Sequence, residues 1–210
     1  MRIKTVDVEW LGHASFLIKG KENVYIDPFV LRSGAPKADV ILVTHDHYDH
    51  CDAQKIESLR KEGTVIISTP SVARKIRGVE TIALGETKTA AGVRVKAVPA
   101  YNPSKKFHPK NTGFGFVFEV DGTKFYHAGD TDFIPEMSAL EKERIDVALL
   151  PIGGTYTMDA REAAAAAALI KPRYVIPMHY GTIPNTEADA TEFKKLVDAK
   201  DLSIEVRLLG

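Results

Sequence analysis

The chain has 210 residues, of which 44% are hydrophobic and 27% are charged, and its 28 basic residues balance its 28 acidic residues. This composition is typical of a globular protein with one substantial core, so we predict a single domain over residues 1–210. The net charge of zero argues against the broad basic surface that nucleic acid or an anionic membrane would favour.

Short apolar runs rich in valine and isoleucine recur along the chain between Gly, Pro and Asp, which is typical of strands joined by turns. This pattern predicts strands over residues 5–10, 14–19, 24–26, 40–44, 65–68, 81–84, 93–97, 113–120, 123–127, 147–151, 174–178 and 204–208. The run from Val40 to Thr44 is continuously apolar, as expected of a strand buried on both faces. The pair Asp121-Gly122 between two apolar runs predicts a hairpin.

Helical spacing of apolar residues predicts helices over residues 52–62, 71–77, 159–170 and 187–199. Asp52 is the N-cap candidate of the first helix, Pro70 precedes the second, and Pro172 stops the third. Residues 100–111 are expected to form a long loop. The order of strands followed by helices occurs twice, which two sheets packed face to face with helices outside would accommodate.

Imidazoles and carboxylates are concentrated directly after the predicted strand 40–44, in the segment Thr44-His45-Asp46-His47-Tyr48-Asp49-His50. This density is hard to explain by packing, and the end of a buried strand is where α/β folds build sites. The donor atoms suit zinc, iron or manganese. His45 and His47 should project to the same side of an extended turn, whereas Asp49 and His50 can face a second ion.

Two further candidate ligands follow other predicted strands. Asp130 comes after Gly129, which allows a tight turn that directs the carboxylate back over the sheet, where it could bridge two cations. His179 ends the predicted strand 174–178 and is followed by a turn. Three such strand ends in one chain predict a metal centre assembled from distant segments.

These segments resemble the metallo-β-lactamase superfamily. The HxHxDH run, the later GDT and the strand-end MHYGT carry this resemblance. The segments WLGHASFLI, YIDP, PIGGTYTMD and VIPMHYGT are similar to its small metal-dependent hydrolase group, the UPF0173 or lactonase-like branch. The resemblance spans Trp10 to Thr182, and it implies an α/β fold that is a four-layer αβ/βα sandwich with the metal site at one edge of the sheets.

The resemblance also implies two divalent metal ions, with zinc as the first choice and manganese or iron as alternatives. The ligands that it implies by position are His45 and His47 for the first ion, Asp49, His50 and His179 for the second, and Asp130 between them. The superfamily usually supplies another histidine near residues 99–102, where this chain has Asn102. We expect His108 as the replacement, but an Asn102 contact, fewer ligands or a single occupied site are open alternatives.

Three residues near these motifs have weaker signals. His13 either orients Asp27 or a metal ligand, or is a hydrogen-bonded core histidine. His127 is expected to be buried and structural. Cys51 is expected at the start of the helix 52–62, facing its packing side.

The predicted activity is that of a metal-dependent hydrolase whose metal-activated water attacks an ester, lactone or phosphodiester-type bond of a small substrate. Asp49 and Tyr180 are the candidate catalytic residues, as proton acceptor and oxyanion donor respectively. Tyr156 or a backbone N–H near Gly153-Gly154 are alternative oxyanion donors. The alternative functions are a metal-binding module without catalysis, a di-iron redox protein, and a nuclease or phosphodiesterase of the same fold.

The remaining expectations concern location and partners. Cys51 is the only cysteine, which excludes an intrachain disulfide. The segment MRIKTVDVEW does not resemble a signal peptide, and no apolar run approaches the roughly 20 residues of a membrane span, so we expect a cytoplasmic protein.

We expect a small-molecule substrate and no nucleic-acid or membrane partner. The loops are short apart from 100–111, which suggests an open site or one completed by a second subunit of a homo-oligomer. A local basic patch at Lys105, Lys106 and Lys110 is an open alternative, but we expect these lysines to be solvated.

Overall fold

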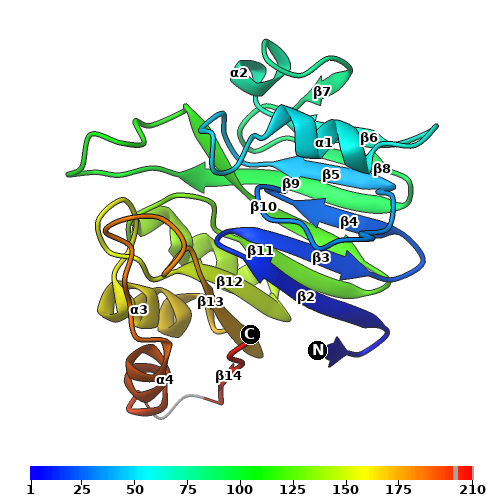
Figure 1. Cartoon of the computed structure of the whole chain (residues 1–210). Coiled ribbons are helices and arrows are strands. Elements are labelled where there is room, and N and C mark those ends of the chain that lie inside the picture. The colour runs from blue at the N-terminus through cyan, green and yellow to red at the C-terminus, as the bar shows by residue number, and fades with distance from the viewer. Residues whose placement is uncertain (201–202, 210) are drawn as a thin grey trace.

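The computed structural model describes residues 1–200 and 203–209, which form two seven-stranded sheets (Figure 1). The first sheet contains β1 (Arg2–Ile3), β2 (Val6–Gly12), β3 (Ser15–Lys19), β4 (Asn23–Ile26), β5 (Val40–Val43), β6 (Val65–Ser68) and β7 (Val79–Thr81), in this spatial order. The second contains β14 (Glu205–Val206), β13 (Tyr174–Met178), β12 (Val147–Pro151), β11 (Thr123–His127), β10 (Gly113–Val120), β9 (Val93–Ala100) and β8 (Thr87–Ala90), in this spatial order.

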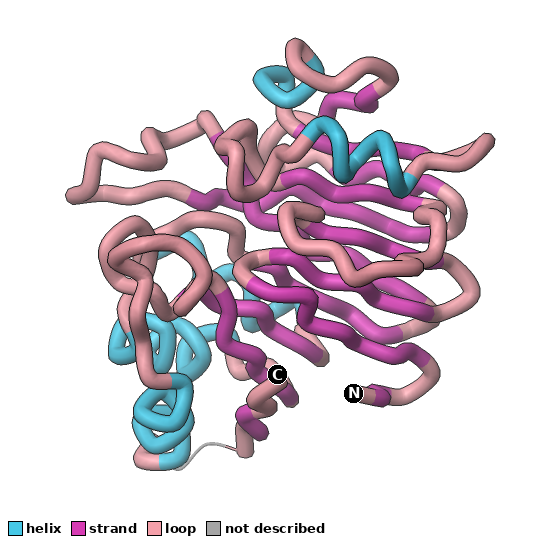
Figure 2. The backbone as a smooth tube through the Cα atoms, viewed as in Figure 1, coloured by secondary structure: helices cyan, strands magenta, loops and turns pink. Residues whose placement is uncertain are grey.

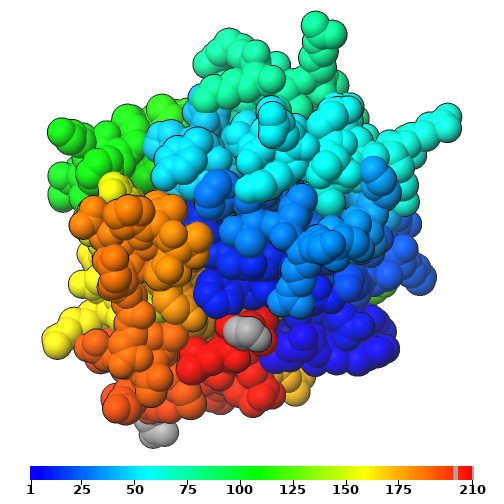
Figure 3. Space-filling model, viewed as in Figure 1, coloured from blue at the N-terminus to red at the C-terminus, as the bar shows by residue number. Residues whose placement is uncertain are grey.

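Helices cover the outer faces of the two sheets (Figure 1). They are α1 (Ala53–Leu59), α2 (Pro70–Ala73), the 3-10 helix η1 (Pro135–Glu143), α3 (Ala160–Ile170) and α4 (Ala190–Asp198). The structure therefore confirms the predicted four-layer αβ/βα sandwich. Figure 3 shows the last segment of the chain, in red, lying beside the amino-terminal strands, in blue. Within the described ranges, no helix combines the length and the apolar character that crossing a membrane requires.

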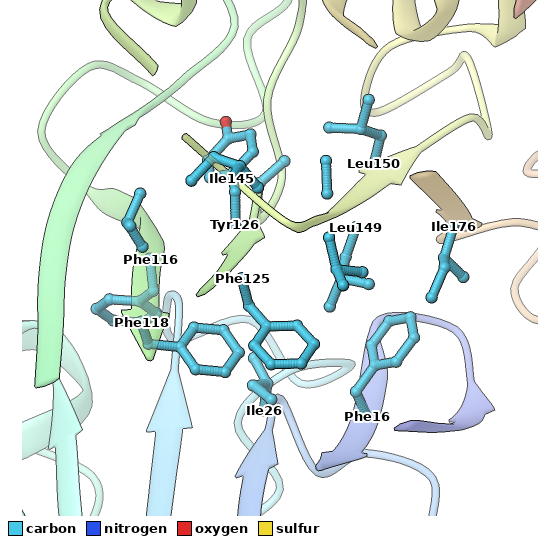
Figure 4. Packing of buried hydrophobic residues seen from close by; sticks show 14 of the residues in the cluster. Phe16, Ile26, Phe116, Phe118, Phe125, Tyr126, Ile145, Leu149, Leu150 and Ile176 are labelled. Atoms are coloured by element: carbon cyan, nitrogen blue, oxygen red, sulfur yellow. The ribbon is translucent and has the colours of Figure 1, made fainter. Parts of the chain in front are cut away.

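The layer between the sheets is apolar because alternate residues of each strand point into it. Phe16 and Ile26 of the first sheet face Phe118 and Phe125 of the second (Figure 4). The rings of Phe118 and Phe125 stack with their centroids 5.1 Å apart. Full burial of one such side chain contributes roughly 1.5–3 kcal/mol, so these contacts hold the sheets together.

The outer face of the first sheet has a separate apolar cluster. Tyr25 and Ile41 point outward, in alternation with the inward-facing Ile26 and Leu42, and pack with Ile56 of α1. The Asp52 side chain caps α1 by accepting hydrogen bonds from two backbone N–H groups. On the second sheet, the small buried alanines of α3 allow that helix to pack closely.

Most predicted strands lie where the sequence pattern placed them, and 65–68, 113–120, 123–127, 147–151 and 174–178 agree at both ends. The predicted strand 81–84 is wrong in position. β7 ends at Thr81 because its residues pair in parallel with β6, and the unpredicted β8 follows. The predicted helices extend too far: α1 ends at Leu59 and α2 at Ala73.

The helix η1 was not predicted. Its buried residues, Met137 and Leu140, are three positions apart, which matches the three residues per turn of a 3-10 helix. A search for apolar residues at α-helical spacing misses this pattern.

The carboxyl ends of several strands meet at one edge of the sandwich. β4, β5 and β6 are mutually parallel in the first sheet, and β11, β12 and β13 are parallel in the second. β9 runs antiparallel to β10, which is antiparallel to β11, so β9 also ends at this edge. Figure 2 shows loops, in pink, gathered there, including the long connection between β9 and β10. Every predicted ligand lies on these loops.

Candidate metal centre

Side chains from separate loops converge at this edge of the sandwich. The groups whose donor atoms lie within 4.8 Å of one another are His13, Asp49, His50 and His179; His45, His47 and His108; and His45, His50 and Asp130. The structure thus brings together all seven side chains that the sequence nominated as ligands. It adds His13, for which the sequence left two roles open.

His108 reaches the histidines of the HxHxDH motif from the long loop after β9. Its Nε2 lies 3.2 Å from His47 Nδ1 and 3.1 Å from Asp130 Oδ2. Asn102 lies behind the ring, where its Oδ1 accepts hydrogen bonds from His108 Nδ1 at 2.8 Å and from the His108 backbone N–H at 3.0 Å. Because a carboxamide oxygen only accepts, Nδ1 carries the proton and the Nε2 lone pair faces the cluster.

Asp27 orients the ring of His50 in the same way as Asn102 orients that of His108. Its Oδ2 accepts a hydrogen bond from His50 Nδ1 at 2.7 Å, which leaves His50 Nε2 facing Asp130 Oδ1 at 3.2 Å. The carboxylate of Asp27 also accepts hydrogen bonds from the backbone N–H and the hydroxyl of Thr44, both at 2.7 Å. A buried carboxylate behind a histidine fixes the ring orientation and makes the opposite nitrogen a better metal ligand.

His13 belongs to the cluster itself. Its Nε2 donates a hydrogen bond to Asp49 Oδ2 at 2.9 Å, and its carbonyl oxygen accepts one from the His179 backbone N–H at 2.9 Å. The ring centroids of His13 and His179 lie 3.9 Å apart. Of the two open roles, the contacts favour orientation of a candidate ligand, and that ligand is Asp49.

The backbone at the cluster is locally strained. His13, Asp27 and His179 have φ angles of 54°, 45° and 56°, in the left-handed region that side chains other than glycine rarely adopt. Each such residue costs on the order of 1–3 kcal/mol and persists only where surrounding contacts enforce it. Gly153 leaves room for this conformation at His179, because a Cβ at position 153 would collide with the His179 carbonyl oxygen.

Electrostatic interactions set the charge states of the buried donors. Burial raises the pKa of Asp130, whereas the neighbouring His179 and His50 lower it. The net result is a pKa well below the usual range of an aspartate. Burial lowers the pKa of His50, but Asp130 and Asp27 raise it well above its usual value. Burial lowers the pKa of His45 well below its usual value. Asp130 is therefore an ionised carboxylate at neutral pH, while the pKa values of His45 and His50 are shifted in opposite directions.

Several donor atoms in the cluster have no hydrogen-bond partner although they are buried: His13 Nδ1, His45 Nε2, His50 Nε2, Asp130 Oδ1, His179 Nδ1 and His179 Nε2. Leaving one buried polar atom unpaired costs about 1–3 kcal/mol, so an arrangement with this many is poorly satisfied by the protein alone. Three of these nitrogens, the Nε2 atoms of His45, His50 and His179, face the carboxylate of Asp130 at 4.0, 3.2 and 3.1 Å. Imidazole nitrogens and carboxylate oxygens are ligands of divalent metals, and the residues therefore fit such ions.

A cavity of about 420 Å³ opens onto the cluster. Its residues are His47, Tyr48, Asp49, Phe107, His108, Asp130, Tyr156, His179, Ile183 and Pro184. A smaller cavity of about 200 Å³ borders the His45, His47 and His108 group and shares Phe107 and Asp130 with the larger one. The larger volume is in the range of sites for small organic molecules.

The candidate oxyanion donors lie at different places. Tyr156 lines the larger cavity, whereas Tyr180 lies outside both cavities at the cluster and stacks on Trp10 with ring centroids 5.2 Å apart. The Gly154 backbone N–H donates to the Met158 carbonyl oxygen at 3.0 Å and is therefore already used. The catalytic role of Tyr180 stays a prediction, and of these two candidate donors only Tyr156 lines a cavity at the cluster.

The remaining polar residues of these motifs have structural contacts. Both ring nitrogens of His127 bond to backbone groups of Ala14 and Gly129, as expected for a structural histidine. Cys51 is buried in the apolar cluster under α1, and burial raises the pKa of its thiol to about 11. Asp46 pairs with Lys75 at 2.9 Å.

Comparison with known proteins agrees with this geometry. The family described as the beta-lactamase superfamily domain matches residues 7–179. A UPF0173 metal-dependent hydrolase of Thermococcus kodakarensis is 43% identical over 212 residues, which cover 93% of each chain. The chain belongs to the UPF0173 metal-dependent hydrolases, a group within this superfamily.

Solved structures resemble this UPF0173 hydrolase over nearly their whole length. One from Parabacteroides distasonis is 34% identical, with a TM-score of 0.85 and coverage of 97% of this chain and 92% of the other. Igni18, a metallo hydrolase of Ignicoccus hospitalis, is 31% identical, with a TM-score of 0.81 and coverage of 98% and 95%.

The sequence did not predict the contacts that two residues of this UPF0173 hydrolase make with candidate ligands. Asp27 lies in the YIDP segment that resembles the group, but nothing local links it to His50, 23 positions away. Asn102 was considered as a departure from the superfamily pattern and as an alternative metal contact, whereas in the structure its Oδ1 accepts hydrogen bonds from His108. Both are buried polar residues just beyond strand ends, and this combination is the signal that could have found them.

Proposed function

We propose that this protein hydrolyses an ester, lactone or phosphodiester-type bond of a small molecule at the floor of the larger cavity. One observation carries the proposal: a cavity of about 420 Å³ ends on a buried set of imidazole and carboxylate donors with unpaired atoms. A purely structural metal site is normally closed by four protein ligands and has no adjoining space for a substrate.

The donors divide into two sets around Asp130. Its Oδ2 lies 3.1 Å from His108 Nε2 and 3.1 Å from His179 Nε2, so this carboxylate stands between both sets. His45, His47 and His108 would hold one ion. Asp49, His50 and His179 would hold the other, with zinc as our first choice for both. Ions in these positions would supply hydroxide at neutral pH and polarise the bond to be cleaved.

Asp49 is the candidate proton acceptor. Burial raises its pKa, but the hydrogen bond from His13 lowers it to about 2, so the side chain is a carboxylate at neutral pH. His13 holds Oδ2, and Asp49 also lines the cavity. A fixed, ionised carboxylate facing a substrate cavity is positioned to accept a proton during hydrolysis. At the cavity mouth, the Tyr156 hydroxyl could donate a hydrogen bond to the oxygen that gains charge.

The test begins with protein stripped of metal and reloaded separately with zinc, manganese or iron(II). Each form is assayed against lactones, carboxylic esters, thioesters and phosphodiesters. We expect His47→Ala and Asp130→Ala to reduce both metal content and kcat/KM, the latter by at least about 100-fold. Asp46→Asn is the control from the same motif, because Asp46 bonds to Lys75.

The competing functions give different results in this assay. Stoichiometric metal without turnover of any substrate would support a metal-binding module. Turnover restricted to phosphodiesters would support a phosphodiesterase or nuclease. Hydrolysis by Asp130→Ala at the wild-type rate would refute the mechanism.

A further inference from the structure

The cavity above the metal centre has an uncharged outer wall. Its members are Tyr48, Phe107, Tyr156, Ile183 and Pro184. Phe107 and Tyr156 meet edge to face with ring centroids 4.9 Å apart. Among the residues described, neither lysine nor arginine lines this cavity, and its only imidazole and carboxylate members are the candidate ligands at the floor.

Two lysines of the loop, Lys105 and Lys110, are already bound to other groups. Lys105 Nζ contacts Asp132 Oδ1 at 2.8 Å, the Gly154 carbonyl oxygen at 2.8 Å and the Thr157 carbonyl oxygen at 2.6 Å. The expectation that Lys105 is solvated was therefore wrong. Lys110 is paired with Glu136 at 3.0 Å. Neither ammonium group is free to meet an anionic substituent in the cavity. Lys106, the third lysine of the loop, is exposed and does not line the cavity.

The same contacts fix the position of the wall. Lys105 joins the loop that carries Phe107 to the segment that carries Tyr156, and Asn102 Nδ2 donates to the Tyr156 carbonyl oxygen at 3.0 Å. The two aromatic rings are thus held together before any ligand arrives. A preformed apolar surface binds an apolar group with little loss of conformational entropy.

We infer that the substrate carries an uncharged, apolar substituent, aromatic or branched aliphatic, which lies against Phe107 and Tyr156. This inference rests on the proposed hydrolase function. The wall then selects apolar esters and lactones over substrates whose substituent is negatively charged. An apolar substituent gains from leaving water at this wall. A carboxylate or phosphate there would lose its hydration without gaining a cationic partner.

The kinetic test compares two esters with the same leaving group, 4-nitrophenyl phenylacetate and 4-nitrophenyl hemisuccinate. For zinc-loaded protein we expect kcat/KM to be at least about 10-fold higher for the phenylacetate. Phe107→Ala should reduce this ratio, mainly by raising KM for the phenylacetate. Phe107→Lys should shift the preference toward the hemisuccinate, since it adds a cation at the wall.

Phe133→Ala is the matched control. Phe133 is 39% exposed and Phe107 is 37% exposed, but Phe133 lines neither cavity at the cluster. Its removal should leave the ratio unchanged. A hemisuccinate preference in the wild type, or equal effects of Phe107→Ala and Phe133→Ala, would overturn the inference while leaving the hydrolase function intact.

Binding provides a readout that needs no turnover. Phenylacetamide and succinamate are compared by ligand-detected NMR with zinc-loaded and with chelator-treated protein. We expect phenylacetamide to bind both forms and to lose binding in Phe107→Ala but not in Phe133→Ala. If no ester is cleaved and this pattern still holds, the apolar site stands and the proposed reaction fails. If phenylacetamide does not bind either form, the apolar site is refuted.

Discussion

Asn102 and His108 hold each other through three hydrogen bonds. Asn102 Oδ1 accepts from the ring Nδ1 and the backbone N–H of His108, and the Asn102 backbone N–H donates to the His108 carbonyl oxygen at 2.8 Å. These bonds fold the loop back on itself after β9. The chain thus supplies an imidazole to the cluster from a position six residues beyond Asn102, whereas the superfamily resemblance expects one near residues 99–102.

Asn102→Ala should weaken metal binding without removing a candidate ligand. The loss of the acceptor behind Nδ1 frees the His108 ring, and losses of such supporting partners typically reduce metal affinity by about 10–100-fold. Competition with a chromogenic chelator measures the affinity. Asn23→Ala is the control, because the side chain of Asn23 bonds to a surface carbonyl group. His108→Ala should lose at least as much metal affinity as Asn102→Ala. The double variant Asn102→Ala, His108→Ala should lose little more than His108→Ala alone. Unchanged affinity in Asn102→Ala would show that the loop holds His108 without it.

Asp27→Asn should destabilise the fold and weaken the same centre. Asp27 accepts hydrogen bonds from three donors on Thr44 and His50, and an amide leaves at least one of them without an acceptor. A buried donor without a partner costs about 1–3 kcal/mol. For a chain of this size, each kcal/mol lowers Tm by roughly 2–4 °C. Calorimetry of metal-free and metal-loaded protein measures both effects.

Asp39→Asn provides the comparison for Asp27. Asp39 also accepts a backbone hydrogen bond, from Asn23 at 2.8 Å, but it is partly exposed and remote from the cluster. We expect a loss below about 1 kcal/mol. Equal losses for both variants would show that the position of Asp27 behind His50 has no special importance.

Gly153→Ala should displace His179. The new Cβ would collide with the His179 carbonyl oxygen and approach Thr186 Cβ at 3.1 Å, and backbone atoms cannot move away as cheaply as a flexible side chain. We expect reduced metal content and a loss of stability on the order of 1–3 kcal/mol, typical of overpacking. Gly63→Ala is the control, since nothing lies within 4 Å of its Cβ although its φ is +83°. It should lose stability through backbone strain and retain its metal, whereas retention of metal by Gly153→Ala would contradict this prediction.

Removal of metal should lower the thermal stability of the wild type. An ion that binds only the folded state at about 1,000 times its Kd stabilises that state by about 4 kcal/mol. Chelation should therefore lower Tm by roughly 8–16 °C, and added zinc should restore it. Asp130→Ala, without the carboxylate between both donor sets, should respond much less to the chelator. A wild-type Tm that does not change on chelation would contradict this prediction, because it would show that the unpaired donor atoms do not stabilise the fold by binding metal.

The sequence by itself was sufficient for most strands and for one wall of the candidate centre. Continuous apolar runs such as 147–151 and the turn at Asp121-Gly122 are local signals, since strand and hairpin preferences depend on neighbouring residues. The density of His and Asp from His45 to His50 is local as well. These features can be recognised without knowing how the chain packs.

Only the tertiary structure decided which distant residues complete the centre and support it. The contacts of Asp27 with His50 and of Phe107 with Tyr156 join separate loops that meet because parallel strands end at one edge of the sandwich. The strand 81–84 was misplaced for a related reason, because pairing with β6 sets the position of β7. The local sequence specifies which groups can bind metal, whereas the packing of the two sheets determines their neighbours and the shape of the cavity above them.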